Sequence, residues 1–460
     1  MLWRRARPQP TGKLPSSRFF RFWRCTRRVT GGFAVALAIA LVSAPAVTKH
    51  LLEKESARIR AAREPFTCAD LVQVLPPGTL NAADVYQQAF DARDLTEEEG
   101  ELLGHLHDEE LPPGLTESMR PALARNEEYF ALLEEAADID ICVFPVEWEK
   151  RAEATLPHLA GVREAARMVG VRALVLAVDG RAEEALQGCS IIPAMAQHLS
   201  SEPAISSQLV RYALLSVGKQ GIEQALNRCN PSAEACRKVY DAYGEVKLSE
   251  SLLRAVKGHR AWCRESAFDV VREGLPPRAN WGIHLAEAQL NNDERGYLRV
   301  MREQMDALAL PWPEAKERAD AILDRFLGGP AWVHLTADLI ILSLGRAAEA
   351  CRLAEGRRDV CRIGLALRAY QAEHGRYPNS LEELAGEGWE IPHDSFSGGP
   401  YRYRREDDGF LVWGVGPDLD DDGGKPFSPS PSPSRARNRP RSDEERARAN
   451  DYDIVFRCGR

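Results

Sequence analysis

Residues 65–350 have the pattern of one helix after another, and this constrains the fold more than any other feature of the chain. Over residues 162–199, apolar residues recur at three- and four-residue spacing. The spacing places apolar side chains on one face of an α-helix, whereas a half-buried strand alternates every second residue. Thr96 with Glu99 forms a capping-box pattern, which is typical of a helix start. Asp179-Gly180 interrupts the pattern, and glycine just past a helix end is the usual stop signal. We therefore expect a helical domain over residues 65–328.

Two segments of this region are similar to each other, and both have the pattern of a helical hairpin with a turn at glycine: residues 176–186 and residues 215–226. They are about 40 residues apart, which is the spacing expected of stacked helix pairs. The first also resembles the turn between the helices of tetratricopeptide repeats, although the aromatic positions of that consensus are absent. The region is thus predicted to be either a helical-hairpin array or an irregular bundle. An array would favour the binding of a protein partner.

The first 29 residues contain nine Lys or Arg and no acidic residue, and residues 31–47 are uncharged and mostly apolar. A bilayer-spanning helix needs about 20 apolar residues, with its positive flank in the cytoplasm. We therefore predict a basic cytoplasmic head over 1–29 and a transmembrane signal-anchor over 30–48. This pattern predicts a single-pass protein of the bacterial inner membrane. The alternative is a cleaved signal peptide ending near Ala44-Pro45-Ala46, which would also export the rest of the chain.

Charge is distributed unevenly along the chain. The formal net charge is −8, but beyond the basic head 51 basic residues stand against 68 acidic ones. An acidic body argues against a nucleic-acid partner, because binding to phosphates requires a basic surface. The basic head is interpreted as a topology signal.

The ten cysteines fit an exported chain without specifying its disulfides. Cys229 and Cys236 flank Asn230-Pro231, a turn that could join two antiparallel helices, so a bridge between them is one prediction. Cys351 and Cys361 would sit ~15 Å apart along a common helix and cannot bond to each other. One of them could instead reach Cys458. A structural zinc site is not expected, since the sequence has no Cys-x-x-Cys pair.

The helical region contains no phosphate-binding glycine loop, His-Glu-x-x-His or Gly-x-Ser-x-Gly motif. His105, His107 and Asp108 form the pattern most similar to a metal cluster, and we interpret them as solvated side chains. The sequence therefore favours a non-enzymatic role. The alternative is an exported hydrolase whose site lies in the helical domain, with His105, His107 or His158 beside carboxylates in a cleft.

The last 126 residues, 335–460, predict a small α+β domain. A helix over 347–374 should end at His374-Gly375, and Ser380 with Glu383 forms a capping box for a short second helix. Period-two alternation at 401–404, a hairpin turn at Asp408-Gly409 and a strand over 410–415 follow. Residues 453–457 form the last expected strand. The fold class expected for the whole chain is mainly α, with an N-terminal transmembrane anchor and a small antiparallel sheet at the C-terminus.

Three motifs occur in this domain in a defined order. The first is the sequence of residues 369–378, the second is the Asp394–Tyr401 turn, and the third is the acidic glycine loop 416–424, which is followed later in the chain by Asp451–Ile454. The order resembles the C-terminal domain of the major (G-type) pseudopilin of type II secretion, a calcium-binding extracytoplasmic module. Calcium prefers six to eight oxygen ligands, which closely spaced carboxylates can supply. The resemblance implies a calcium site formed by these residues: Asp418, Asp420, Asp422, Asp451 and Asp453.

The resemblance covers only residues 350–458, and Leu37 stands where the family has glutamate after its cleavage site. A segment rich in Pro, Ser and Arg over 426–450 is predicted to be a disordered insertion between the two halves of the metal site. We therefore expect a membrane-anchored extracytoplasmic binding or scaffold protein whose helical domain contacts a protein partner. An exported hydrolase and an accessory component of a type II secretion-like system are the alternatives.

Overall fold

The computed structural model describes residues 43–104, 112–276, 281–328, 336–337, 344–426 and 452–459. It is mainly helical, with one small antiparallel sheet near the C-terminus, and this confirms the expected fold class in outline. The basic head and most of the predicted anchor over 30–48 lie outside the described residues. No helix in the described part of the chain is both long and apolar enough to span a bilayer.

Residues 43–61 are helical and precede the labelled elements. The helices that follow are η1 (Cys68–Leu71), α2 (Ala82–Ala92), α3 (Glu97–Leu102), α4 (Leu115–Arg125), α5 (Glu127–Ala137), η3 (Trp148–Glu153), α6 (His158–Val178), α7 (Ala182–Cys189), α8 (Ile191–His198), α9 (Ile205–Leu226), α10 (Ala233–Gly244), α11 (Ser249–Arg264), the π-helical η4 (Glu265–Asp269), α12 (Val270–Gly274), α13 (Trp281–Ala307), α14 (Glu314–Leu327), α16 (Leu344–His374) and α17 (Leu381–Gly386). The strands are β1 (Arg402–Glu406), β2 (Gly409–Gly414) and β3 (Ile454–Cys458).

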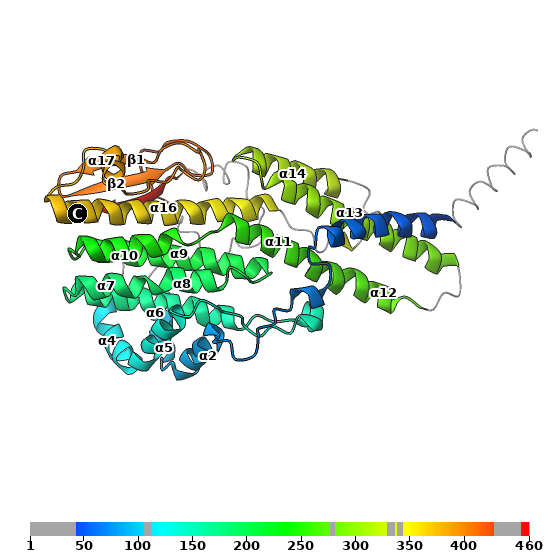
Figure 1. Cartoon of the computed structure of the whole chain (residues 1–460), viewed down its shortest axis with the longest axis horizontal. Helices are drawn as coiled ribbons and strands as arrows, with labels where there is room; N and C mark the ends of the chain where they lie inside the picture. The colour runs from blue at the N-terminus through cyan, green and yellow to red at the C-terminus, as the bar shows by residue number, and fades with distance from the viewer. Residues whose placement is uncertain are drawn as a thin grey trace, which may run out of the picture.

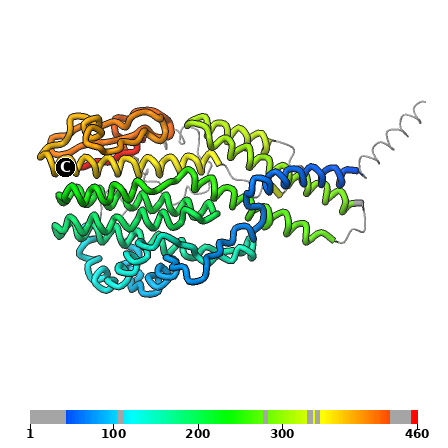
Figure 2. Tube along the Cα trace, viewed as in Figure 1, coloured from blue at the N-terminus to red at the C-terminus, as the bar shows by residue number. Residues whose placement is uncertain are grey.

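The helices stack in layers (Figure 1). Helices α2, α4 and α5 form one outer layer, followed by α6 to α8, then by α9 and α10, and then by α16. The sheet covers the outer side of α16, so it lies on the opposite side of the stack from α2 and α5. Residues 43–61 run beside α13 at the end of the molecule far from the C-terminus (Figure 2), and Arg302 of α13 pairs there with Glu55 at 2.9 Å.

Several local predictions are confirmed. Thr96 accepts a hydrogen bond from the backbone N–H of Glu99, and the Glu99 carboxylate accepts one from the N–H of Thr96, so the capping box is complete. Helix α6 ends at Val178, and Gly180 adopts φ +76°, a left-handed conformation that favours glycine. Helix α16 ends at His374, followed by Gly375 with φ +71°.

The second repeat-like segment, 215–226, was expected to contain a turn, and this prediction is wrong. The segment lies inside the continuous helix α9. Gly218 serves a packing role there, because a Cβ at this position would collide with the hydroxyl of Tyr243 on α10. A small residue was therefore needed for close helix packing, and the sequence pattern alone could not distinguish that need from a turn.

The capping box expected at Ser380 is also wrong, although helix α17 begins where predicted. Ser380 occupies the N-cap position without a side-chain hydrogen bond to the helix. The carboxylate of Glu383 instead accepts hydrogen bonds from Asn379 at 2.8 Å and from the Tyr370 hydroxyl at 3.1 Å. Because the Glu383 carboxylate is bonded to these two side chains, it does not cap α17. The bond from Tyr370 instead connects α17 to the end of α16.

The sheet has the order β1-β2-β3, with both pairs antiparallel. Val412 on β2 lies opposite Tyr403 on one side and Phe456 on the other. All six residues of β2 are buried, because α16 covers one face of this central strand and the acidic loop packs against Leu411 and Trp413 on the other. Gly364 on α16 makes this contact possible, since a Cβ there would lie 2.5 Å from Cε1 of Phe456.

The predicted bridge between Cys229 and Cys236 is wrong: all nine cysteines among the described residues are free thiols. The turn between them does join α9 to α10, as expected. The Cys229 thiol donates back to the carbonyl of Ala225, whereas Cys236 is wholly buried in α10. Cys236 thus belongs to the main core, which extends from α2 through α16 to the sheet, whereas Cys229 lies in a separate small cluster with Ala185 and Ala225.

Candidate functional site

The acidic glycine loop follows strand β2 and is tightly folded. Leu419, Gly423 and Gly424 all have positive φ, at 69°, 70° and 84°. The carboxylate of Asp418 accepts a hydrogen bond from the backbone N–H of Asp420 at 3.3 Å. Successive left-handed residues turn the backbone sharply and keep several aspartates within a short stretch of chain.

Asp453 immediately precedes β3 and contacts the glycine end of this loop. Its side chain is almost fully buried, with 1% of its surface exposed. One carboxylate oxygen, Oδ2, accepts a hydrogen bond from the N–H of Gly424 at 2.7 Å. The other oxygen, Oδ1, has no hydrogen-bond partner among the described residues. A buried carboxylate oxygen without a partner is costly, so this atom marks a position where a cation would be stabilised.

The two ends of the predicted 426–450 insertion lie side by side. The N–H of Asp453 donates to the carbonyl of Lys425 at 2.8 Å, and Pro426 forms a parallel bridge with Asp453. The segments that precede and follow the insertion are therefore neighbours in the fold. Most of the insertion itself lies outside the residues that the structure describes.

Electrostatics in the loop favour an added positive charge. Partial burial raises the pKa of Asp418, and the charges of Asp422 and Asp420 raise it further. Burial likewise raises the pKa of Asp453, with added repulsion from Asp421 and Asp422. Both carboxyls therefore resist ionisation more than they would in isolation, and a bound cation would relieve that repulsion.

Asp421 has a different role that the sequence reasoning missed. Its carboxylate accepts hydrogen bonds from the indole N–H of Trp413 at 2.8 Å and from Nε of Arg402 at 2.6 Å. These bonds lower the pKa of Asp421, the Trp413 bond most of all. Asp421 thus fastens the loop to β1 and β2. The sequence carries no signal for this role, because it depends on the cross-strand pairing that places Arg402 beside Trp413.

Of the five predicted ligands, the structure brings Asp418, Asp420, Asp422 and Asp453 to one end of the sheet, and Asp451 lies outside the described residues. Within the described part of the chain, three ligand atoms lie within 4.8 Å of one another only in Glu373, His374 and Glu387. That exposed trio, at the C-terminal ends of α16 and α17, was not predicted. The aspartates offer the right oxygen donors for calcium, but their side chains would have to rotate inward to share an ion.

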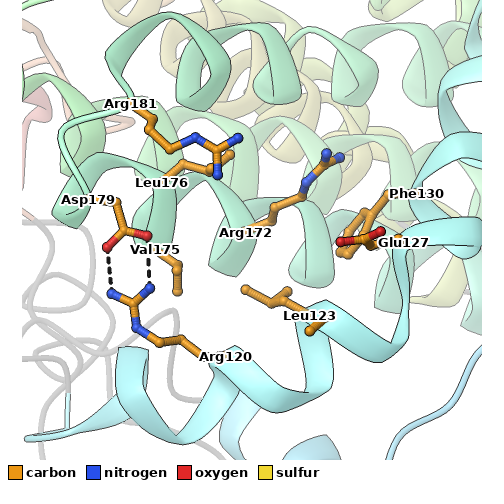
Figure 3. Close-up of a pocket in the computed structure, with 10 residues that line it drawn as sticks. Arg120, Leu123, Glu127, Phe130, Arg172, Val175, Leu176, Asp179 and Arg181 are labelled. Atoms are coloured by element: carbon orange, nitrogen blue, oxygen red, sulfur yellow. Dashed lines mark hydrogen bonds and ion pairs between the residues drawn. The ribbon is translucent and has the colours of Figure 1, made fainter.

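Two cavities occur among the first helices. The first has a volume of about 390 Å³, and Figure 3 shows Arg120 of α4, Arg172 of α6 and Arg181 of the turn before α7 among its lining residues. Arg120 forms a bidentate pair with Asp179 at 2.8 and 2.6 Å. Arg172 pairs with Glu134 at 2.9 Å, and Arg181 pairs with Glu184. Because each arginine is already matched by a carboxylate, this cavity has little excess positive charge for an anion.

The second cavity, of about 350 Å³, includes His158, one of the residues considered for hydrolysis. His158 Nε2 lies 2.7 Å from Oε1 of the buried Glu202, within ion-pair range but without the alignment of a hydrogen bond. The Ser207 hydroxyl donates to Glu202 and not to His158, so these three residues do not form an activated serine. His105, His107 and Asp108 lie outside the described residues.

No family model matches the chain, and neither the curated proteins nor the solved structures include a match. The class of protein is therefore described by its fold and its candidate site alone. The molecule is a layered helical protein with a three-stranded antiparallel sheet, and an acidic loop closes one end of that sheet.

Proposed function

We propose that this protein is a membrane-anchored extracytoplasmic binding or scaffold protein with a calcium-stabilised, pseudopilin-like C-terminal module. The observation that supports it best is the partnerless Oδ1 atom of the buried Asp453, next to a loop that contains four further aspartates. The helical region would bind a protein partner, and residues 30–48 would hold the molecule at the inner membrane.

Calcium suits this position for chemical reasons. The ion prefers carboxylate and carbonyl oxygens, and it accepts irregular geometry more readily than magnesium does. Asp453 would provide the buried ligand, and Asp418, Asp420 and Asp422 would provide ligands from the loop side. Binding would offset the mutual repulsion that raises the pKa of Asp418 and Asp453.

A scaffold role is supported by how the module is joined to the helices. Helix α16 packs along both α9 and α10, and the hydroxyl of Tyr240 on α10 donates to the carbonyl of Glu390 at 2.5 Å. The N–H of Arg457 on β3 also donates to Glu223 of α9 at 2.7 Å. An ion that stabilises the sheet would therefore also stabilise the helical layers against which it packs.

The test uses the purified full-length protein, because α16 shares its core with α9 and α10. Thermal unfolding is recorded in chelator, in calcium and in magnesium. At free calcium a hundredfold above Kd, the expected gain is about 2.7 kcal/mol, seen as a higher Tm. Asp453→Asn should abolish the calcium gain, because it removes the buried charge while preserving the side chain's shape.

Asp421→Asn is the matched control. It lies in the same loop, but its carboxylate is held by Trp413 and Arg402. This variant should lower Tm equally with and without calcium and keep the calcium-dependent rise. A wild-type protein that folds but shows the same Tm in chelator and in calcium would refute the calcium proposal.

A further inference from the structure

The 350 Å³ cavity lies among α2, α5 and the start of α6, on the opposite side of the helix stack from the sheet (Figure 1). Its volume is at the lower end of the range for sites that bind small molecules. It shares no residue with the acidic loop, so a ligand in this cavity would not contact the proposed calcium site directly.

The wall contains a buried hydroxyl group that has no hydrogen-bond partner among the described residues. Tyr129 of α5 is 1% exposed, and its hydroxyl has no hydrogen-bond partner among the described residues. Burial raises the pKa of this hydroxyl, so it remains protonated at neutral pH and can donate a hydrogen bond. Buried hydroxyls are normally satisfied, and one that lines a cavity without a partner is a group available to a ligand.

Part of the remaining wall is apolar and contains aromatic rings. Phe90 of α2 and Phe144 line the cavity together with Pro145 and Pro157. Phe144 is stacked on His158, with ring centroids 4.2 Å apart and an angle of 8° between the planes. Such surfaces favour a flat apolar or aromatic group, because aromatic rings pack well in offset-stacked or edge-on contacts.

The charged groups at the cavity balance one another. Arg93 pairs with Glu164 at the rim, and His158 lies in ion-pair range of Glu202 behind the wall. Neither sign of charge is left in excess. A charged ligand would have to disrupt one of these pairs or enter an apolar site without a counter-ion, and both are costly.

The geometry points to a binding site for a small uncharged molecule with a planar apolar body and one carbonyl or hydroxyl oxygen. The oxygen accepts a hydrogen bond from the Tyr129 hydroxyl, and the planar body lies between Phe90 and Phe144. This role requires the hydroxyl of Tyr129 and the neutrality of the site, and each requirement can be tested separately.

Three planar probes of nearly equal shape test the neutrality: benzamide, benzoate and benzamidine, which are uncharged, anionic and cationic. Binding to the full-length protein is measured by NMR titration in the presence of chelator, so that calcium has no part in the result. Benzamide is expected to bind at least fivefold more tightly than either charged probe. Equal affinities, tighter binding of a charged probe, or no binding of benzamide would overturn the inference.

Tyr129→Phe tests the hydroxyl. Because that hydroxyl has no partner in the described protein, its removal should not lower Tm, but it should weaken benzamide binding at least fivefold. The matched control is Tyr243→Phe, which removes another buried, partnerless hydroxyl between α9 and α10, outside the cavity. It should leave benzamide affinity unchanged. Unchanged affinity in Tyr129→Phe would mean that the hydroxyl takes no part in binding and would contradict the assignment.

Discussion

The indole N–H of Trp312 donates a hydrogen bond to the backbone carbonyl of Pro417 over 3.2 Å. Trp312 lies just before α14, and Pro417 begins the acidic loop, so this bond joins the helical region to the proposed calcium site. Trp312 is buried and meets the ring of Phe396 edge-on at 5.1 Å. The conformation of the loop therefore depends on a helix connection more than 100 residues earlier in the chain.

Trp312→Phe should weaken both stability and the calcium response. Phenylalanine keeps most of the apolar contact but removes the donor, at a cost of about 1–2 kcal/mol. Denaturant unfolding with and without calcium measures both effects. Trp262→Phe is the control, because the Trp262 N–H donates to Arg151 far from the loop. It should cost a similar amount but leave the calcium-dependent gain intact, and an equal loss of that gain would contradict the prediction.

Gly364→Ala should destabilise the junction between helix and sheet. The added Cβ would lie 2.5 Å from the Phe456 ring, so α16 and β3 would have to separate, at a cost of about 1–3 kcal/mol. Gly386→Ala in α17 is the control, because nothing lies within 4 Å of a Cβ built there. Chemical unfolding should show a loss for the first variant and none for the second. Equal stabilities would mean that the sheet accommodates the methyl group.

Asp359 should make the protein more stable at mildly acidic pH. It is buried on α16 beside Arg358, and burial raises its pKa to about 6. Because the folded pKa is raised above the unfolded value of about 3.9, ionised Asp359 opposes folding above pH 6. Ionised Asp359 lowers the free energy of unfolding by about 3 kcal/mol at pH 7, and this loss disappears as the pH falls through 6 toward 4.

Urea unfolding in chelator at pH 7 and pH 5 measures this dependence. Asp359→Asn should remove this contribution to the gain at pH 5, since the amide does not titrate. Asp418 and Asp453 also have raised pKa values and contribute with the same sign, whereas Asp421 has a lowered pKa and contributes stability that is lost only in strong acid. If Asp359→Asn showed the same pH dependence of the unfolding free energy as the wild type, Asp359 would not be a source of that dependence.

The buried thiols should react slowly in the native protein. Burial raises the pKa of Cys236 to about 12 and also raises those of Cys229 and Cys458. The thiolate is the reactive form, so alkylation should be slow until the chain unfolds. Mass spectrometry after iodoacetamide treatment, with and without denaturant, measures this. Disulfide-linked peptides from non-reduced native protein would contradict the free-thiol structure.

The sequence predicted the elements that depend on neighbouring residues. The Thr96–Glu99 box, the stop at Gly180, the end of α16 at Gly375 and the hairpin between β1 and β2 all follow from local backbone and capping rules. The failures occurred where a residue serves a distant contact. Gly218 was predicted to form a turn, but it instead leaves space for the side chain of Tyr243. Glu383 was predicted to cap a helix, but its carboxylate instead accepts a hydrogen bond from Tyr370.

For the candidate site, the sequence alone identified the aspartates that could act as calcium ligands. It could do so because closely spaced carboxylates on a glycine-bearing loop all offer oxygen donors. Only the tertiary structure decided their separate roles: Asp421 bonds to Trp413, while Asp453 is buried with one free oxygen. The same holds for Tyr129, whose hydroxyl lacks a partner because of how α5 packs beside α2 and α6. Whether a side chain is buried, and whether its polar atoms find hydrogen-bond partners, depends on atoms from separate elements of the fold. The local sequence pattern therefore does not predict either property.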